Sequence, residues 1–355
     1  MSGTTNGQTA SPRCDHRFLD ILRTVSIALL ICTLRAARSD ALDPSNTLAD
    51  YTLTNWSEDA GPFPFGEYAI AQDRDGYLWL GARTGLIRFD GTNFAIWKGS
   101  EPLPDDRISA ICIAKDGAMW LGFGTIGGVT RIRAGKVTNF GKPDGLIGEV
   151  NALLEDDGGA IWAGTYGGLY KFGNNRWEHV DGADGLPTEA VTGLFRDSRR
   201  NFWVGTSVGV YRRGPDDSMF RFFASSTVVD FAEDSAATIW VTDVVKAFAV
   251  LDAPSRSART LLGWKEALGR RLLYDRSGSL WIGTRGSGLL RVRDLNGATS
   301  LTSIERLTRD EGLPSAEIRA LFEDRDGTLW IGTRMGLSRL SESNRSEERR
   351  VGKEC

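Results

Sequence analysis

Few residues in this chain could do covalent or metal chemistry. Its 355 residues include 2 histidines and 4 cysteines. Only His179 and Cys112 lie between the first 41 residues and the charged C-terminal tail. Zinc sites and nucleophilic sites that depend on Cys–His or Ser–His–Asp sets therefore lack their residues. We predict no catalytic residue, no metal and no cofactor, and hence a protein that is not an enzyme.

Polar side chains that could hold a ligand recur at two kinds of loop. Those expected after the second strand of a repeat are Arg83, Tyr166, Arg285 and Arg334, and those expected before the first strand are Arg107, Glu149, Glu189 and Glu317. Strands that alternate in direction bring both kinds of loop to one face. A funnel lined in this way suits a small polar ligand such as a saccharide or a peptide fragment. The alternative is that these are ordinary solvated charges.

These loops belong to a repeat of roughly 42 residues that is marked by a tryptophan. The tryptophans are Trp79, Trp120, Trp162, Trp203, Trp240, Trp281 and Trp330, with spacings of 41, 42, 41, 37, 41 and 49. A period in the forties with strand-rich units is typical of a β-propeller. We predict an all-β, seven-bladed propeller of four-stranded blades over residues 42–340, with the tryptophans as packing residues.

Counting the outer strands predicts how the ring closes. Six outer strands are expected after the first six repeats, at 94–97, 137–140, 177–180, 219–223, 260–264 and 304–308. The last repeat stops at Leu340 without one, and residues 51–56 supply a strand before the first repeat. We predict that this N-terminal strand pairs with the last repeat, which leaves no exposed sheet edge.

The first strand of each repeat is expected to line the central channel. The central small residues of five of these strands are Ala69, Ala110, Ala152, Gly193 and Ala320. The fifth and sixth repeats carry Asp230 and Arg271 at this position instead. Because adjacent blades would bring the two charges together, we predict an ion pair at the channel, with either a structural or a ligand-binding role.

The two ends of the chain differ from the repeats. Basic residues precede an uncharged stretch at 24–34, which is too short to span a bilayer but typical of a signal peptide. We expect residues 1–41 to be a signal peptide; a buried helix or an uncleaved anchor are the alternatives. The last eleven residues, RSEERRVGKEC, resemble the translation of a sequencing adapter. We therefore expect residues 341–355 to be non-native and the natural chain to continue. A net charge of −3 argues against nucleic acid as a partner.

The repeat resembles that of the two-component regulator propeller family. The last copy reads DRDGTLWIGTRMGLSR at 324–339, and Gly-Leu-Pro turns at 185–187 and 312–314 link repeats. The resemblance covers about residues 41 to 340. The fifth repeat departs from it, because Trp240 is followed by Val241, Thr242 and Asp243 in place of Ile-Gly-Thr. Either this repeat has drifted or it carries a specialised surface.

The resemblance implies a function and a location. Such propellers are exported sensor regions of membrane-bound signalling receptors, whose later parts include a histidine kinase or a diguanylate cyclase. It therefore implies a periplasmic ligand-sensing region, anchored in the inner membrane by the full-length protein. The implied partners are the chain's own C-terminal signalling domains and a second copy in a receptor dimer. The alternatives are a propeller enzyme, either a lyase or a glycan-active hydrolase, and a scaffold for protein interactions.

Overall fold

The computed structural model describes residue 3 and residues 42–57, 69–99, 101–243, 249–252, 257–260, 268–293 and 304–342. The expected signal peptide lies outside these residues, as do residues 343–355 of the tail. Among the described residues no helix is long and apolar enough to cross a bilayer.

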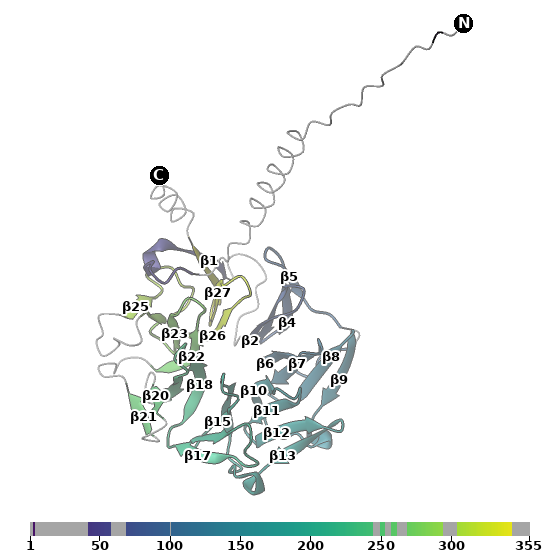
Figure 1. The fold of residues 1–355 in the computed structure, drawn as a ribbon. Helices are drawn as coiled ribbons and strands as arrows, with labels where there is room; N and C mark the ends of the chain where they lie inside the picture. Colours follow the sequence, from purple (N-terminus) through teal and green to yellow (C-terminus); the bar gives the residue numbers. More distant parts are fainter. Residues whose placement is uncertain are drawn as a thin grey trace. The chain divides into compact units, whose positions relative to one another are not determined.

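The described residues form strands that assemble into seven four-stranded antiparallel sheets, arranged around a central axis (Figure 1). Within these residues the helices are three single 3-10 turns, η1 (Leu48–Asp50), η3 (Lys142–Asp144) and η4 (Gly182–Asp184). The predicted all-β class and the four-stranded blades are confirmed.

Every sheet has the same strand order, from an inner strand at the axis to an outer strand at the rim. The inner strands are β2 (Ala69–Gln72), β6 (Ile108–Ile113), β10 (Val150–Glu155), β14 (Val191–Arg196), β18 (Val228–Glu233), β22 (Gly269–Tyr274) and β26 (Ile318–Glu323). The second strands are β3 (Leu78–Ala82), β7 (Met119–Phe123), β11 (Ile161–Thr165), β15 (Phe202–Thr206), β19 (Ile239–Asp243), β23 (Leu280–Thr284) and β27 (Leu329–Thr333).

The third and outer strands complete each sheet. The third strands are β4 (Gly85–Phe89), β8 (Val129–Arg133), β12 (Gly168–Gly173), β16 (Val210–Arg213), β20 (Ala249–Asp252), β24 (Leu289–Val292) and β28 (Gly336–Glu342). The outer strands are β5 (Phe94–Ile96), β9 (Lys136–Phe140), β13 (Arg176–Val180), β17 (Arg221–Ala224), β21 (Ser257–Thr260), β25 (Ile304–Leu307) and β1 (Tyr51–Ser57).

The prediction of seven blades needs correction. Six blades, not seven, are built from four strands that follow one another in the chain, and we number them 1 to 6 from β2–β5 to β22–β25. The remaining sheet, here called the closing sheet, combines β26, β27 and β28 with β1 from the other end of the chain. The physical reason is that the last repeat has no outer strand of its own to cover the edge of β28.

The closing sheet joins the two ends of the propeller. β1 pairs with β28 from Tyr51 opposite Glu342 to Ser57 opposite Gly336, so the predicted pairing of the N-terminal strand is confirmed. The strand also runs two residues beyond Leu340, the predicted end of the domain. At the axis each inner strand packs against the next, and β26 packs against β2.

A fully buried arginine holds the N-terminal segment in place. The Arg291 guanidinium lies 5.2 Å from the ring centroids of both Tyr51 and Trp281. Its Nη1 donates a 2.9 Å hydrogen bond to the Asn46 carbonyl oxygen, and its Nε donates to Ser279 Oγ at 3.0 Å. The buried charge is tolerated here because backbone, hydroxyl and aromatic groups surround it and the Glu305 carboxylate lies 3.5 Å from Nη1.

Two outer strands begin two or more residues away from their predicted starts. In blade 4 the strand begins at Arg221 rather than 219, because the Phe220 N–H donates to the Asp184 carbonyl and the Phe220 ring packs against Phe202. In blade 5 the strand is Ser257–Thr260, so the predicted range 260–264 is shifted, and residues 261–267 lie outside the described ones.

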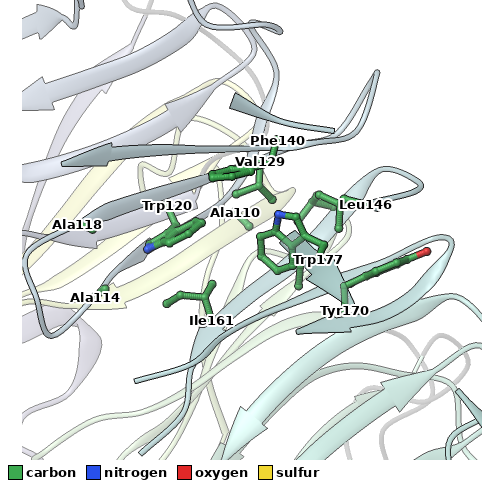
Figure 2. Packing of buried hydrophobic residues seen from close by; sticks show 12 residues of the cluster. Ala110, Ala114, Ala118, Trp120, Val129, Phe140, Leu146, Ile161, Tyr170 and Trp177 are labelled. Carbon is green, nitrogen blue, oxygen red and sulfur yellow. The ribbon is translucent and has the colours of Figure 1, made fainter. Parts of the chain in front are cut away.

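The hydrophobic core lies between neighbouring sheets. Figure 2 shows the cluster between blades 2 and 3, where Trp120 stacks on Phe140 with centroids 6.0 Å apart and meets the edge of Trp177 at 6.1 Å. Aromatic side chains of two blades thus share one interface, which supplies the burial that a single sheet could not provide.

Close to the axis the blades approach more tightly still. The glycine two residues after the tryptophan faces the first residue of the next inner strand. A Cβ on Gly164 would lie 2.5 Å from Val191 Cγ1, and one on Gly283 would lie 2.6 Å from Ile318 Cγ2. Because no real Cβ tolerates these distances, the spacing of the blades requires glycine here.

The unusual fifth blade keeps this spacing by an exchange of partners. It carries the fully buried Thr242 where other blades carry glycine. The next inner strand begins with Gly269, whereas five other inner strands begin with valine or isoleucine. At this contact the side chain therefore belongs to the second strand β19 instead of to the next inner strand β22, and the two strands are neighbours.

A hydrogen bond from most of the repeat tryptophans ties the second strand to the turn before it. In six sheets the indole Nε1 donates to the carboxylate of the aspartate six residues earlier, at 2.6 to 2.9 Å. The other oxygen of Asp324 accepts the N–H groups of Asp326 and Thr328 at 3.0 and 2.9 Å. Blade 2 has Ala114 at the equivalent position. One carboxylate thus fixes both the turn and the tryptophan.

We expect Asp324→Ala to lower the free energy of unfolding by about 1–3 kcal/mol, because the buried indole N–H of Trp330 loses its acceptor. Asp326→Ala removes an exposed carboxylate of the same turn and should cost less than about 0.5 kcal/mol. Urea denaturation of both variants measures the difference. Equal losses would show that the indole hydrogen bond is unimportant.

The partner exchange at blades 5 and 6 predicts strong energetic coupling. Gly269→Val should destabilise the protein by about 1–3 kcal/mol, because the new side chain meets Thr242. Combined with Thr242→Gly, the same change recreates the pair found at the other interfaces and should recover most of the loss. A double-mutant cycle by urea denaturation should give a coupling energy of about 0.5–3 kcal/mol. Strictly additive effects would disprove the exchange.

Candidate ligand-binding pocket

A β-bulge recurs at the start of six inner strands. In β10, Val150 pairs with Thr165 and Ala152 pairs with Gly164, so Asn151 has no partner opposite it. The same one-residue shift occurs in β6, β14, β18, β22 and β26. A bulge re-aims the side chain of the unpaired residue. The six bulged residues are Ser109, Asn151, Thr192, Val229, Arg270 and Arg319.

All six bulged residues line one pocket of about 480 Å³. Its other lining residues include Arg107, Glu149, Tyr166, Arg271 and Arg285. Six different sheets thus contribute one residue each from the same structural position. The volume falls in the range of small-molecule sites.

The pocket corrects the prediction of which residues face the channel. The expected residues were Ala69, Ala110, Ala152, Gly193 and Ala320 with Asp230 and Arg271, and among the described lining residues only Arg271 is found. The residue one position earlier lines the pocket instead, because the bulge shifts the alternation of sides by one. In β2, which begins at Ala69, the preceding residue lies outside the described ones.

On blades 2 to 4 the bulged residues are hydrogen-bonded to the next blade. Ser109 Oγ donates to the Val150 carbonyl at 2.5 Å, and Asn151 Nδ2 donates to the Val191 carbonyl at 2.8 Å. The Thr192 hydroxyl donates to the carbonyl of Val228 in the same way. These three side chains therefore link neighbouring inner strands, and this part of the wall is uncharged.

On blade 6 and the closing sheet the bulged residues are arginines held by one carboxylate. Glu317 Oε1 accepts hydrogen bonds from Arg270 Nη1 and from Arg319 Nε, each at 3.0 Å. The three side chains are about one fifth exposed or less. Two guanidinium groups thus share one carboxylate oxygen on this side of the pocket.

The predicted ion pair between Asp230 and Arg271 takes a different form. The two residues lie on adjacent inner strands, but the Asp230 carboxylate accepts the N–H groups of Leu272 and Phe231 at 3.0 and 2.9 Å. Arg271 Nη1 donates instead to the Arg270 carbonyl at 3.1 Å. Burial raises the pKa of the Asp230 carboxyl, and the positive charge of Arg271 opposes this shift. Asp230 and Arg271 thus interact through their charges without a direct hydrogen bond, because backbone N–H donors already occupy the carboxylate.

The eight ligand-binding candidates divide into two groups. Arg107, Glu149, Tyr166 and Arg285 line the pocket. Arg83, Glu189, Glu317 and Arg334 are not among its described lining residues, although Glu317 contacts two arginines that are.

The two kinds of loop meet within each sheet, as the alternating strands predict. The Tyr166 N–H donates to the Glu149 carbonyl at 3.0 Å, and the Arg285 N–H donates to the Leu268 carbonyl at 3.0 Å. Both loops therefore surround the same mouth of the channel. Tyr166 is 60% exposed and offers its ring to the solvent there.

Fold and pocket together define a β-propeller with a pocket at one end of its axis. The sequence profile of the family described as two component regulator propeller matches residues 102–125 and 312–335. The chain thus carries two-component regulator propeller repeats, as its sequence predicts. A comparison with curated proteins finds no significant match.

The propeller is similar to extracellular domains of two hybrid two-component systems from B. thetaiotaomicron. One is 21% identical with a TM-score of 0.68, covering 83% of this chain and 40% of that one. The other is 18% identical with a TM-score of 0.68, covering 82% and 42%. This chain therefore spans about two fifths of the length of these domains. Virginiamycin B lyase from Staphylococcus aureus is 15% identical with a TM-score of 0.65, covering 82% and 99%. At these identities the similarity establishes the fold.

The Asp230 environment predicts a pH-dependent effect of Arg271. The pKa of Asp230 in the folded chain is raised above the unfolded value of about 3.9. Its contribution to stability is therefore fully present below that pH and is lost as the pH rises through the folded pKa. Arg271→Gln removes the charge that opposes the shift. It should cost about 1–3 kcal/mol at pH 7 and much less at pH 4, where the carboxyl is closer to neutral.

Urea denaturation of the Arg271→Gln variant at both pH values measures this effect. The exposed Arg285, on the same blade, provides a control, and Arg285→Gln should show no such pH dependence. A loss for Arg271→Gln that is equal at pH 4 and pH 7 would exclude electrostatic stabilisation of Asp230.

Proposed function

We propose that this chain is the extracytoplasmic ligand-sensing propeller of a membrane-bound two-component signalling receptor, and that its ligand binds in the axial pocket. The observation that carries the proposal is that the bulged residues of six sheets line one pocket. A small polar molecule bound there, such as a saccharide or a peptide fragment, would contact most of the ring at once. Binding could therefore bias the relative positions of several blades, which is what a sensor requires.

The receptor part of the proposal is supported by the repeats and by the fold comparison. The matched repeats belong to a family described as a two component regulator propeller, and similar folds occur in extracellular domains of hybrid two-component systems. Export to the periplasm, anchoring in the inner membrane and dimerisation through the full-length protein extend this reasoning. They depend on segments outside the described residues.

A non-catalytic role is favoured over a lyase. One structure of virginiamycin B lyase is described as catalytically inactive after replacement of a histidine by alanine. In the described part of this chain the one histidine, His179, lies on the outer strand β13, with its ring 4.9 Å from that of Tyr170. It is not among the residues that line the pocket. A histidine at the rim of a blade has no access to a ligand at the axis.

Ligand binding is tested with a panel of neutral and acidic oligosaccharides and short peptides, by thermal shift and then calorimetry. We expect at least one of them to bind, and Arg285→Ala to weaken its binding about tenfold, because this arginine lines the pocket mouth. Arg83→Ala is the matched control, since Arg83 occupies the same loop position in blade 1 and is not among the described lining residues. Binding that both variants weaken equally, or that neither weakens, would place the ligand elsewhere.

The receptor assignment is tested separately on the gene. A reading frame that continues into a membrane-spanning segment and a kinase or cyclase module would support it. A natural stop codon directly after the closing sheet would contradict it.

A further inference from the structure

We infer that the ligand of the axial pocket carries an oxyanion, held by four arginines that line one side of the pocket. This inference rests on the proposed function, because it names the chemical class of ligand for the same site. The arginines are Arg270, Arg271 and Arg285 of blade 6 and Arg319 of the closing sheet, and we call them the arginine arc.

Among the described lining residues, basic side chains outnumber acidic ones. Five of these thirteen residues are arginines, the arc and Arg107, whereas one, Glu149, is acidic. The protein as a whole carries a net charge of −3, so this excess is local. Like charges gathered in a concave site with restricted solvent raise the local potential and attract a counter-ion.

Two carboxylates lie beside the arc in the described part of the chain, and both have other partners. Glu317 bonds Arg270 and Arg319 through one shared oxygen, and its other oxygen lies 4.0 Å from Arg334. Asp230 directs its oxygens to backbone N–H groups, and its raised pKa makes it a weaker counter-charge. Among the described residues, four guanidinium groups of the arc thus lie near one shared carboxylate oxygen and one buried carboxyl group.

Arg271 is the member of the arc best placed to meet a ligand. Arg271 lies directly after the bulge in β22. Among the described contacts, its guanidinium donates one hydrogen bond, from Nη1 to the backbone carbonyl of Arg270. A guanidinium has five N–H donors in a planar fork that matches a carboxylate, sulfate or phosphate. Arg285 adds an exposed guanidinium from the loop above it.

The opposite wall suggests what the rest of the ligand looks like. In the ring of inner strands, β10 lies across the axis from β22 and β26, and its blade contributes Glu149 and Tyr166 to the pocket. A carboxylate there disfavours a second anionic group, while an exposed aromatic ring favours a flat, less polar surface. The arrangement fits a small molecule with an anionic end and a neutral ring or apolar body. A volume of about 480 Å³ excludes a long polyanion from the pocket itself.

The experiment uses matched probes on the full chain. A uronic-acid disaccharide is compared by calorimetry with the neutral hexose disaccharide of the same linkage, and inorganic sulfate and phosphate distinguish carboxylate from other oxyanions. We expect at least one anionic probe to bind at least tenfold more tightly than the neutral disaccharide. Its affinity should fall as the salt concentration rises.

Variants test whether the arc holds the anion. Arg271→Gln should weaken binding of the anionic probe at least tenfold, and Arg271→Lys, which keeps the charge but loses the fork, should weaken it less. Arg285→Gln is the second variant, because an exposed loop arginine can be replaced without risk to the fold. Arg83→Gln should leave the affinity unchanged.

The outcomes separate this inference from the proposed function. If the neutral disaccharide binds as tightly as the acidic one and Arg285→Gln weakens both equally, the pocket is a ligand site but the arc is not an anion site. Absence of binding by every anionic probe at millimolar concentration overturns the inference. Anion binding that survives both Arg271→Gln and Arg285→Gln also overturns it.

Discussion

The architecture depends on the close approach of neighbouring blades at the axis. Each second strand offers a glycine to the first side chain of the next inner strand, and a Cβ on Gly164 would already collide with Val191. This contact sets how near the inner strands come to one another and hence the width of the channel. The bulge follows directly after the contacting residue, so the same strand that packs tightly at one position turns a side chain into the pocket at the next.

The hydrogen bond between aspartate and tryptophan acts at the other end of the second strand. It fixes a turn that is exposed to solvent to a side chain that is buried between blades. In the sixth blade both Asp275 and Trp281 are almost fully buried. An unpaired indole N–H or carboxylate at this depth would be costly, which explains why both groups occur together in most repeats. The two interactions together make each repeat a unit that is complete only beside its neighbour.

The sequence was sufficient to predict the repeat, the order of strands in a blade and the pairing of the N-terminal strand with the last repeat. These features depend on residue types that recur, such as tryptophan, glycine and the aspartate turns. The bulge was missed because the residues at that position share no chemistry: serine, asparagine, threonine, valine and arginine all occur there. Missing it displaced the predicted channel wall by one residue, and the backbone N–H groups that bind the Asp230 carboxylate were not foreseen. The loop residues of the pocket mouth were partly found, because their position relative to tryptophan is fixed.

The exchange of Thr242 and Gly269 has a consequence for how such a ring can change. At the other contacts of this kind the glycine and the branched side chain have the same order, so blades could be duplicated or recombined and still fit their new neighbours. Blades 5 and 6 fit each other. Beside a standard neighbour, Thr242 of blade 5 would meet a branched side chain, whereas Gly269 of blade 6 would face another glycine. They can be inherited or moved only as a pair. The arginines of blade 6 are therefore tied to one place in the ring, and the pocket has a fixed orientation relative to the two ends of the chain.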